Sequence, residues 1–414
     1  MTKKAVIKFG GDDLANGERV KKAAKKVIQS DYDEVVVVVS AMGKTTDKLV
    51  ELTSRVDACE SDYADIVSMG EKTSAKVFSS ALKDLGENSS YIVPDEDGWP
   101  VITDESHIDA EPNLERSKEA FKENIEPKLE KEIPVICGFL GKDTEGNITT
   151  LGRGGSDTTA LLLGNCSEAD EVVLVKDTEG LLSGDPDLID DSKPIDEIDI
   201  KELFALSHGG AKVVRDKGLR YKLPGQILRI APFSSDYLDE GGTEVHGEFS
   251  SDEALKSGKD ISAVTIICDL NTRTLESIFS AIDQKTDITI SGISSGEKSI
   301  TIFSEKDAKT VLQDLHKKMS EFKAISHRED VGRIEITHPK FVDNPGWVTN
   351  ITEIFSLKNI NIIEITTSKA TINIYMDEEQ VDDAVLSVKQ ILGQEKKEKI
   401  MDIKKEDRGE LVEI

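Results

Sequence analysis

The chain has 414 residues and a formal net charge of −28, because 80 acidic side chains outnumber 52 basic ones. This length predicts roughly two to four domains, and the acidity argues against nucleic acid or an anionic membrane as the main partner. Its four cysteines lie far apart and no run of about eighteen apolar residues occurs, which argues against a disulfide framework, a structural zinc site and a membrane span. The first residues contain no apolar segment typical of a secretion signal, so we expect a cytoplasmic protein.

Residues 1–235 alternate strand-like and helical patterns, which is typical of a parallel sheet covered by helices. Residues 34–40 contain five valines in succession, as expected of a strand buried on both faces. Further strands are predicted at residues 5–9, 90–93, 134–140, 147–150, 171–175 and 226–230. Helices are predicted at residues 17–30, 47–56, 71–85, 114–131, 158–166 and 201–206.

The rest of the chain repeats itself after a polar, acidic segment at residues 236–260 that predicts a linker. Residues 278–280 recur at 354–356, and residues 300–303 resemble 372–375. Each copy predicts the order strand, helix, strand, strand, helix, strand, which is a ferredoxin-like α+β unit. We therefore expect a first domain at 1–235, small units at 261–330 and 331–404 that form a regulatory module, and a charged tail at 405–414.

Three glycine-rich segments each follow a predicted strand. Lys8, Gly10 and Gly11 lie where backbone N–H groups and an ammonium could bind a phosphate, although a β-turn is the alternative. Residues 40–47 lack the first glycine of a nucleotide P-loop, so they predict either a hydroxyl-rich substrate loop or a helix N-cap at Thr46 or Asp47.

The segment at residues 150–157 is the most informative of the three. Arg153 stands among three glycines and offers a planar fork for a carboxylate or phosphate, which a structural turn does not require. We favour a binding loop over a plain turn, in which Asp157 would be the N-cap. Residues 176–186 follow the next strand, where nucleotides bind in parallel sheets, but their Gly and Asp-Pro pairs are also typical of turns.

Taken in order, these segments resemble the aspartate kinases of the amino acid kinase family, which carry a C-terminal pair of ACT domains. The resemblance covers nearly the whole chain: KFGG at 8–11, VVSAMGKTTD at 38–47, MGEKTSA at 69–75, GRGGSDTTA at 152–160 and GAKV at 210–213. It implies a three-layer α/β sandwich with a mostly parallel sheet, followed by two ferredoxin-like ACT domains.

The resemblance also implies an activity: transfer of a phosphoryl group from MgATP to the side-chain carboxylate of L-aspartate, the first step towards lysine, threonine and methionine. A carboxylate is already ionised, so the reaction needs alignment and positive charge rather than a general base. The residues that the resemblance assigns to catalysis are Lys8, Asp157 and Lys212. Those assigned to the substrate are Ser40, Thr46, Glu71, Arg153 and Ser156, and those assigned to ATP are Lys8, Gly10, Gly11, Asp177, Gly180, Asp185 and Lys212.

For the C-terminal module, the resemblance implies an amino-acid effector such as lysine or threonine, bound by Asn344, Pro345, Gly346, Asn361 and Ile362. It also implies a homodimer or larger assembly. ATP is expected as co-substrate with Mg²⁺, and no protein metal site is assigned.

Several residues depart from the family pattern. Asp12 and Asp13 replace Thr-Ser, and could either help to hold Mg²⁺ through water or weaken ATP binding. Lys176 replaces threonine, and further replacements are Leu182, Asp187, Val214, Arg215 and Asp216. Two alternatives therefore stay open: a related kinase with another acceptor, and a degenerate kinase that acts as an amino-acid sensor.

Overall fold

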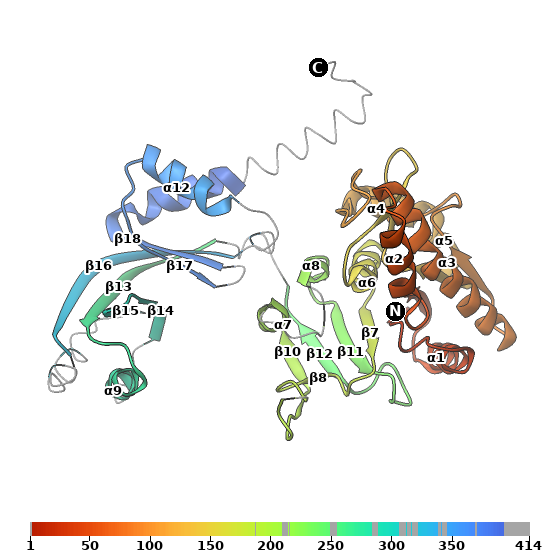
Figure 1. Ribbon diagram of the computed structural model, residues 1–414, viewed down its shortest axis with the longest axis horizontal. Coiled ribbons are helices and arrows are strands. Elements are labelled where there is room, and N and C mark those ends of the chain that lie inside the picture. The colour runs from red at the N-terminus through yellow and green to blue at the C-terminus, as the bar shows by residue number, and fades with distance from the viewer. Residues whose placement is uncertain are drawn as a thin grey trace, which may run out of the picture. The chain divides into compact units, whose positions relative to one another are not determined.

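The computed structural model describes residues 2–186, 188–208, 214, 216–248, 255–283, 289–305, 312, 316, 322–337, 341, 346–368 and 371–392. The chain forms two compact units, Met1–Phe249 and Ser250–Ile414, each built around one large sheet (Figure 1). No helix within the described ranges is long and apolar enough to cross a membrane.

The first unit contains an eight-stranded sheet in the order β10-β12-β11-β7-β1-β2-β4-β3. Its strands are β1 (Lys4–Phe9), β2 (Glu34–Val39), β3 (Ser89–Ile92), β4 (Ile133–Cys137), β7 (Glu171–Lys176), β10 (Glu197–Asp199), β11 (Ile227–Pro232) and β12 (Thr243–His246). All neighbours pair in parallel except β11 and β12. Two small antiparallel pairs are β5 (Leu140–Lys142) with β6 (Ile148–Thr150) and β8 (Leu181–Leu182) with β9 (Pro194–Ile195).

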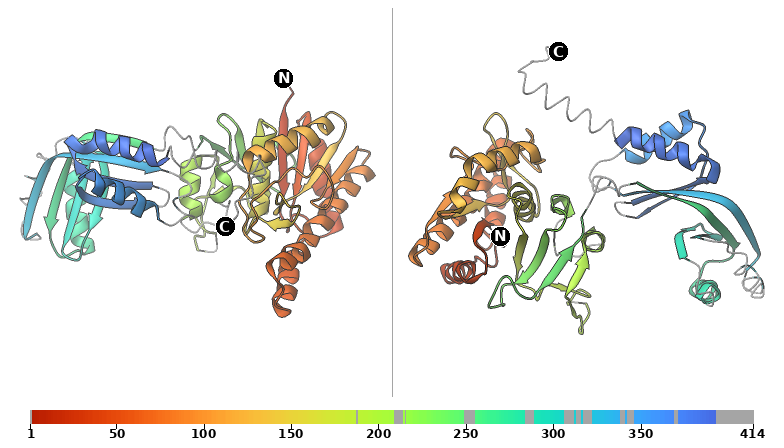
Figure 2. Two further views of the ribbon diagram at one scale, coloured as in Figure 1. Left: turned by 90° about the horizontal axis from the view of Figure 1, so that it is seen from above. Right: turned by 180° about the vertical axis from the view of Figure 1, so that it is seen from behind.

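Helices cover both faces of this sheet (Figure 2). They are α1 (Gly17–Gln29), α2 (Thr45–Arg55), α3 (Glu60–Asp84), α4 (Leu114–Asn124), α5 (Glu126–Leu129), α6 (Gly155–Cys166), α7 (Ile200–His208) and α8 (Asp216–Leu219). Consecutive side chains of β1 point to opposite faces of the sheet. Phe9 packs on Phe78 of α3, whereas Lys8 reaches Asp157 of α6. The expected three-layer α/β architecture with a mostly parallel sheet is confirmed.

Two helices begin earlier than the sequence predicts. The α3 helix begins at Glu60 rather than residue 71, and its interior includes Gly70, a residue that weakens helices. A Cβ at Gly70 would lie 2.8 Å from Cβ of Ala41, so the loop after β2 requires glycine there. The α6 helix begins at Gly155 with Gly154 as its N-cap, so the alternative of Asp157 as N-cap is wrong.

The α2 helix likewise begins after a different residue than expected. Its N-cap is Lys44, which makes no side-chain capping hydrogen bond. Thr46 and Asp47 therefore lie inside the first turn, and the N-cap alternative for both is wrong. The Thr46 hydroxyl instead reaches Glu71, a contact between distant parts of the chain that no local pattern encodes.

The second unit contains a six-stranded antiparallel sheet in the order β14-β15-β13-β16-β18-β17. Its elements are β13 (Leu255–Ile267), α9 (Thr272–Asp283), β14 (Thr289–Ser295), β15 (Ser299–Glu305), β16 (Ala324–Thr337), α12 (Trp347–Leu357), β17 (Ile362–Ser368), β18 (Thr371–Asp377) and the 3₁₀ turn η1 (Glu378–Gln380). A helix follows over residues 381–392. The α+β character expected for this part is confirmed.

The two copies of the repeat share their longest strands. β13 pairs with β16 twice, through Leu255–Gly258 against Arg333–Ile336 and through Ile261–Ile267 against Ala324–Val331. The segment expected to be a linker, 236–260, thus contains β12 and the start of β13. Its polar, glycine-containing sequence hid these strands, because β12 has only one large apolar side chain, Val245.

Each half of this sheet has its own helix-covered core (Figure 1). Ile278 and Ile282 of α9 pack on β13 and β15, whereas Ile351 and Phe355 of α12 pack on β16 and β18. The opposite faces of the two halves meet in a third cluster, where the rings of Phe303 and Tyr375 stack with centroids 3.7 Å apart.

Candidate active site

The candidate site lies at the carboxyl ends of β7, β1, β2 and β4, which are neighbours in the sheet. The loops after these strands are joined by backbone hydrogen bonds: the Gly43 N–H donates to the Gly11 carbonyl at 2.8 Å and the Gly138 N–H to the Val39 carbonyl at 2.8 Å. A Cβ at Gly11 would lie 2.9 Å from the carbonyl oxygens of Ala41 and Gly43. The KFGG segment therefore needs its second glycine so that the loop after β2 can approach.

Two lysines converge on one buried carboxylate at this edge. Lys8 Nζ lies 2.7 Å from Asp157 Oδ1, and Lys176 Nζ lies 2.8 Å from Asp157 Oδ2. Burial alone would raise the pKa of Asp157, but the two ammonium groups hold it well below its usual value. Burial lowers the pKa of Lys8, and the Lys176 charge adds to this, although Asp157 opposes both.

Asp13 organises the loop after β1. Its Oδ2 accepts the Gly10 N–H at 2.8 Å, so the N–H expected to support a phosphate is engaged within the loop. Burial raises the pKa of Asp13 to about 6, and nearby Asp177 adds to the rise. Arg19 Nη2 lies 2.7 Å from Asp177 Oδ1, and its guanidinium stacks over the Phe233 ring at 4.4 Å. Asp12, in contrast, is exposed.

Among the described residues, only one of the two carboxylate oxygens of Glu71 has hydrogen-bond partners. Its Oε1 accepts hydrogen bonds from the Ala41 N–H at 3.2 Å and the Thr46 hydroxyl at 3.3 Å. Its Oε2 is buried and has no hydrogen-bond partner among the described residues. Burial raises the pKa of this carboxyl, which is 2% exposed, to about 7. A buried acceptor without a donor is costly, so this oxygen is suited to a cationic ligand.

The remaining substrate candidates lie after β2, after β6 and at the start of α6. Ser156 is buried, and a Cβ at Gly138 would lie 2.7 Å from its hydroxyl, so the loop after β4 passes directly over it. Ser40 is half-buried at the end of β2, and its N–H donates to the Phe9 carbonyl at 3.1 Å. Arg153 is exposed at the tip of its glycine loop.

Phe139 was not singled out by sequence patterns. It follows β4 with a φ of 69°, a conformation that is uncommon for a residue other than glycine. Its N–H donates to the Thr159 hydroxyl at 3.1 Å and its carbonyl accepts the Leu151 N–H at 2.8 Å. Strained residues of this kind gather at functional sites, but strain is not visible in sequence.

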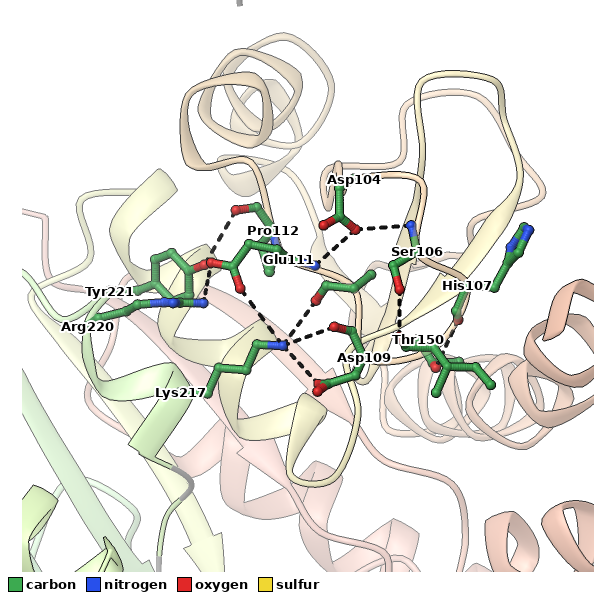
Figure 3. A network of polar contacts seen from close by, with 12 residues as sticks. Asp104, Ser106, His107, Asp109, Glu111, Pro112, Thr150, Lys217, Arg220 and Tyr221 are labelled. Carbon is green, nitrogen blue, oxygen red and sulfur yellow. Dashed lines mark hydrogen bonds and ion pairs between the residues drawn. The ribbon is translucent and has the colours of Figure 1, made fainter. Parts of the chain in front are cut away.

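A polar network joins Lys217 and Arg220 to the segment that contains Asp109 and Glu111 (Figure 3). A Cβ at Gly152, whose φ is +69°, would lie 2.2 Å from Asp109 Oδ1, so Asp109 sits against that loop. Lys217 of α8 holds Asp109 through its Oδ1 at 2.9 Å and its carbonyl at 3.3 Å. Arg220 Nη2 lies 2.5 Å from Glu111 Oε1 in the same segment. The network joins α8 to the loop that bears Arg153.

The remaining predicted site residues lie beside β8, in the second unit or outside the described ranges. Gly180 is buried with a φ of +97°, and Asp185 is exposed between β8 and β9. In the second unit, Gly346 is the N-cap of α12, and the Asn361 N–H donates to Gln380 Oε1 at 3.1 Å just before Ile362 opens β17. Lys212, Asp187, Arg215, Asn344 and Pro345 lie outside the described residues.

Lysines and glycine loops at the carboxyl edge of a parallel sheet are the features of a phosphoryl-transfer site. Residues 3–227 match the Amino acid kinase family, and the chain belongs to this family. The resemblance noted in the sequence is thereby confirmed.

Relatives named aspartokinase match along nearly the whole chain. The protein from Bacillus sp. (strain MGA3) is 29% identical over 408 residues, which is 93% of this chain and 96% of the relative. The protein from Mycolicibacterium smegmatis is 27% identical over 435 residues, covering 94% and 96%.

Solved structures agree with these relatives. The aspartate kinase from Synechocystis matches with a TM-score of 0.72 and 26% identity, covering 94% of this chain and 69% of that one. E. coli aspartokinase III, solved in complex with aspartate and ADP, has a TM-score of 0.54 at 20% identity over 92% of this chain and 98% of that one, which shows the shared fold.

Proposed function

We propose that the protein is an aspartate kinase, which transfers the γ-phosphoryl group of ATP to the side-chain carboxylate of L-aspartate. A bond forms between a carboxylate oxygen and the γ-phosphorus, and the bond from that phosphorus to the β–γ bridging oxygen breaks, leaving ADP and an acyl phosphate. The observation that carries the proposal is the pair of lysines fixed on Asp157 at the sheet edge. Aspartokinase names among the relatives support the choice of acceptor.

The acceptor amino acid needs recognition of one cation and two anionic groups. Glu71 Oε2, buried and unpartnered among the described residues, fits the ammonium group. Arg153, exposed on its loop, is suited to a bidentate contact with a carboxylate. Thr46, Ser40 and Ser156 would complete the pocket with hydroxyl groups. No general base is required, because the nucleophile is already a carboxylate.

The nucleotide would approach through the loops after β1 and β7. Lys8 neutralises developing charge on the phosphoryl group, and Asp157 fixes the position of its ammonium. Asp177, Gly180, Asp185 and Lys212 stay assigned to the nucleotide, and Gly11 shapes the loop beside it.

A divalent cation fits the donor chemistry of the loop after β1. Asp13 Oδ1 is buried and accepts no hydrogen bond from the described residues, and Arg19 Nη2 lies 3.7 Å from it and 2.7 Å from Asp177 Oδ1. Asp177 is close enough to raise the pKa of Asp13. These two carboxylates would hold Mg²⁺ together with ATP, since this ion is usually bound by one or two carboxylates and substrate phosphates. When bound, Mg²⁺ would neutralise phosphate charge.

For the second unit we propose regulation by an amino acid such as lysine or threonine, bound by Gly346, Asn361, Ile362 and the neighbouring Asn344 and Pro345. Assembly as a homodimer or larger oligomer and a cytoplasmic location stay proposals. The domain limits at 235, 260, 330 and 404 are likewise proposals.

A direct assay tests the acceptor. ATP, Mg²⁺ and L-aspartate are incubated with hydroxylamine, which traps the acyl phosphate as aspartoyl hydroxamate. Hydroxamate formation is expected, and Arg153→Ala should raise the aspartate KM by about 10-fold or more, as loss of a charge-assisted contact implies. ADP formation with another acid but not aspartate would favour a different acceptor. An amino acid that shifts Tm when MgATP does not would favour a sensor.

The network that joins Lys217 to Asp109 leads to a second expected result. Lys217→Met should lower kcat/KM for aspartate by about 10-fold, because Asp109 then no longer fixes the Gly152 turn, and small displacements of binding groups are costly. The KM for ATP should change little. Steady-state kinetics compares this variant with Lys21→Met, which removes a surface ion pair to Asp84. Equal kcat/KM values in both variants would contradict a positioning role.

A further inference from the structure

Lys176 occupies a position that the assigned roles leave unexplained. Leu174 of β7 pairs in parallel with Lys8 of β1, and side chains alternate along a strand. Lys176 therefore extends from the same face of the sheet as Lys8, two residues closer to the loops. Both side chains converge on Asp157, at 2.7 and 2.8 Å.

The second lysine gives this buried cluster an excess positive charge. One carboxylate faces two ammonium groups here, so Lys8, Asp157 and Lys176 carry one excess positive charge when both lysines are protonated. A further carboxylate, Asp13, acts on Lys8 from the loop after β1. This local excess of positive charge, carried by the more exposed Lys176, favours an anion that joins the cluster. The Lys176 side chain is 23% exposed whereas that of Lys8 is 7% exposed, so Lys176 lies on the side from which a ligand can enter.

We propose that Lys176 is a phosphate-binding cation in addition to those already assigned, which contacts the γ-phosphoryl group of ATP together with Lys8. The two oxygens of Asp157 hold the two ammonium groups apart, on separate sides of one carboxylate. A transferring phosphoryl group spreads its charge over three equatorial oxygens, so two fixed cations can each bind a different oxygen. Lysine binds phosphate as a point charge.

This assignment rests on the proposed phosphoryl transfer, but not on aspartate as the acceptor. It gives Lys176 a role of its own at a position where the family resemblance leads to threonine. Within the described part of the chain, Lys8 and Lys176 are the cations in ion-pair contact with Asp157. Arg153 is exposed and would remain available for the acceptor.

Nucleotide binding separates this role from a structural one. Calorimetry with the full-length protein measures Kd for ADP and for the non-hydrolysable analogue β,γ-imido-ATP in Lys176→Met. The analogue should bind about 10-fold or more weakly, while the Kd for ADP should stay within about twofold, since only the analogue carries a γ-phosphoryl group. Lys176→Arg should recover most of the affinity. The matched control is Lys4→Met, which removes a lysine paired with Glu34 at 3.3 Å at the other end of β1.

Two outcomes would overturn the assignment: unchanged affinity for both nucleotides, or equal losses for both. If Lys176→Met fails to fold, as judged by Tm, Lys176→Thr replaces it in the same comparison. A selective loss of the ATP analogue in a protein that forms no aspartoyl hydroxamate would uphold the role of Lys176 and overturn aspartate as the acceptor. A wild-type protein that binds neither nucleotide would overturn both.

Discussion

Asp157→Asn is expected to lower kcat by about 10²- to 10³-fold, the range seen when a charge-stabilising group of an active site is lost. The amide offers one acceptor oxygen in place of two and turns a donor towards the second ammonium. Lys8 and Lys176 then lose their shared counterion, and neither stays fixed against the phosphoryl group. Hydroxamate kinetics at saturating ATP and aspartate measures the effect.

The pH dependence of this variant reports on Lys8. Burial lowers the pKa of Lys8, and Asp157 raises it. Without the Asp157 charge the pKa of Lys8 falls further, so the ammonium loses its proton as pH rises. The deficit in kcat should therefore deepen as pH rises, whereas a merely structural defect would stay constant.

Asp143→Asn is the matched control for Asp157→Asn. Asp143 is also a buried aspartate of the first unit, but it accepts hydrogen bonds from Glu145 and Asn147 in the turn between β5 and β6. Its replacement should lower Tm with little effect on kcat. Breaking the buried ion pairs of Asp157 should also destabilise the fold, by about 3–5 kcal/mol. A kcat for Asp157→Asn close to that of the control would refute the role of Asp157.

Glu71→Gln is expected to lower kcat/KM for aspartate by about 10- to 100-fold, because a neutral amide replaces the ionic partner of the ammonium group. In the wild-type enzyme, burial raises the pKa of Glu71 to about 7, so the carboxyl is largely neutral at pH 6 and ionised at pH 8. The wild-type kcat/KM should therefore rise through this interval. The variant should lack the rise, and a variant profile that keeps it would assign the titration to another group.

Stability provides an independent check on Glu71. Its pKa rises from the ordinary value of 4.5 to about 7 in the folded protein, so the folded state binds the proton more tightly than the unfolded state. This group stabilises the fold at low pH, and the contribution is lost as pH rises from about 4.5 to about 7. The difference in unfolding free energy between wild type and Glu71→Gln should follow that trend, by roughly 3 kcal/mol at most. Denaturant unfolding at several pH values measures it.

Sequence patterns predicted the central sheet well because its strands are buried on both faces. The valines at 35–39 are 0–7% exposed, and a continuous apolar run of this length is typical of a central strand in a parallel sheet. The glycine loops were also located correctly: two follow β1 and β2 of the central sheet, and the third follows β6 of the small antiparallel pair. The start of α3 was missed because Gly70 weakens helices locally, and only the approach of Ala41 accounts for glycine at that position.

The sequence predicted which residues belong to the candidate site, but not which of them contact one another. Lys8 and Asp157 were both singled out, yet their contact depends on how α6 packs against β1. Lys176 is a departure from the family pattern, and its link to Asp157 follows from the register of β1 and β7 together with the packing of α6. Arg19 and Asp109 carry no local pattern, because their roles arise from contacts with segments more than 40 residues away.

The pairing of β13 with β16 joins the two copies of the repeat into one sheet. This pairing limits how each copy can fold or move by itself. β13 and β16 each supply hydrogen bonds to both halves, so a single copy would leave half of a long strand unpaired. Such an edge invites pairing with another chain. The duplicated sequence therefore encodes one cooperative body rather than two interchangeable modules, and a change in twist of either long strand alters the geometry at both of its ends.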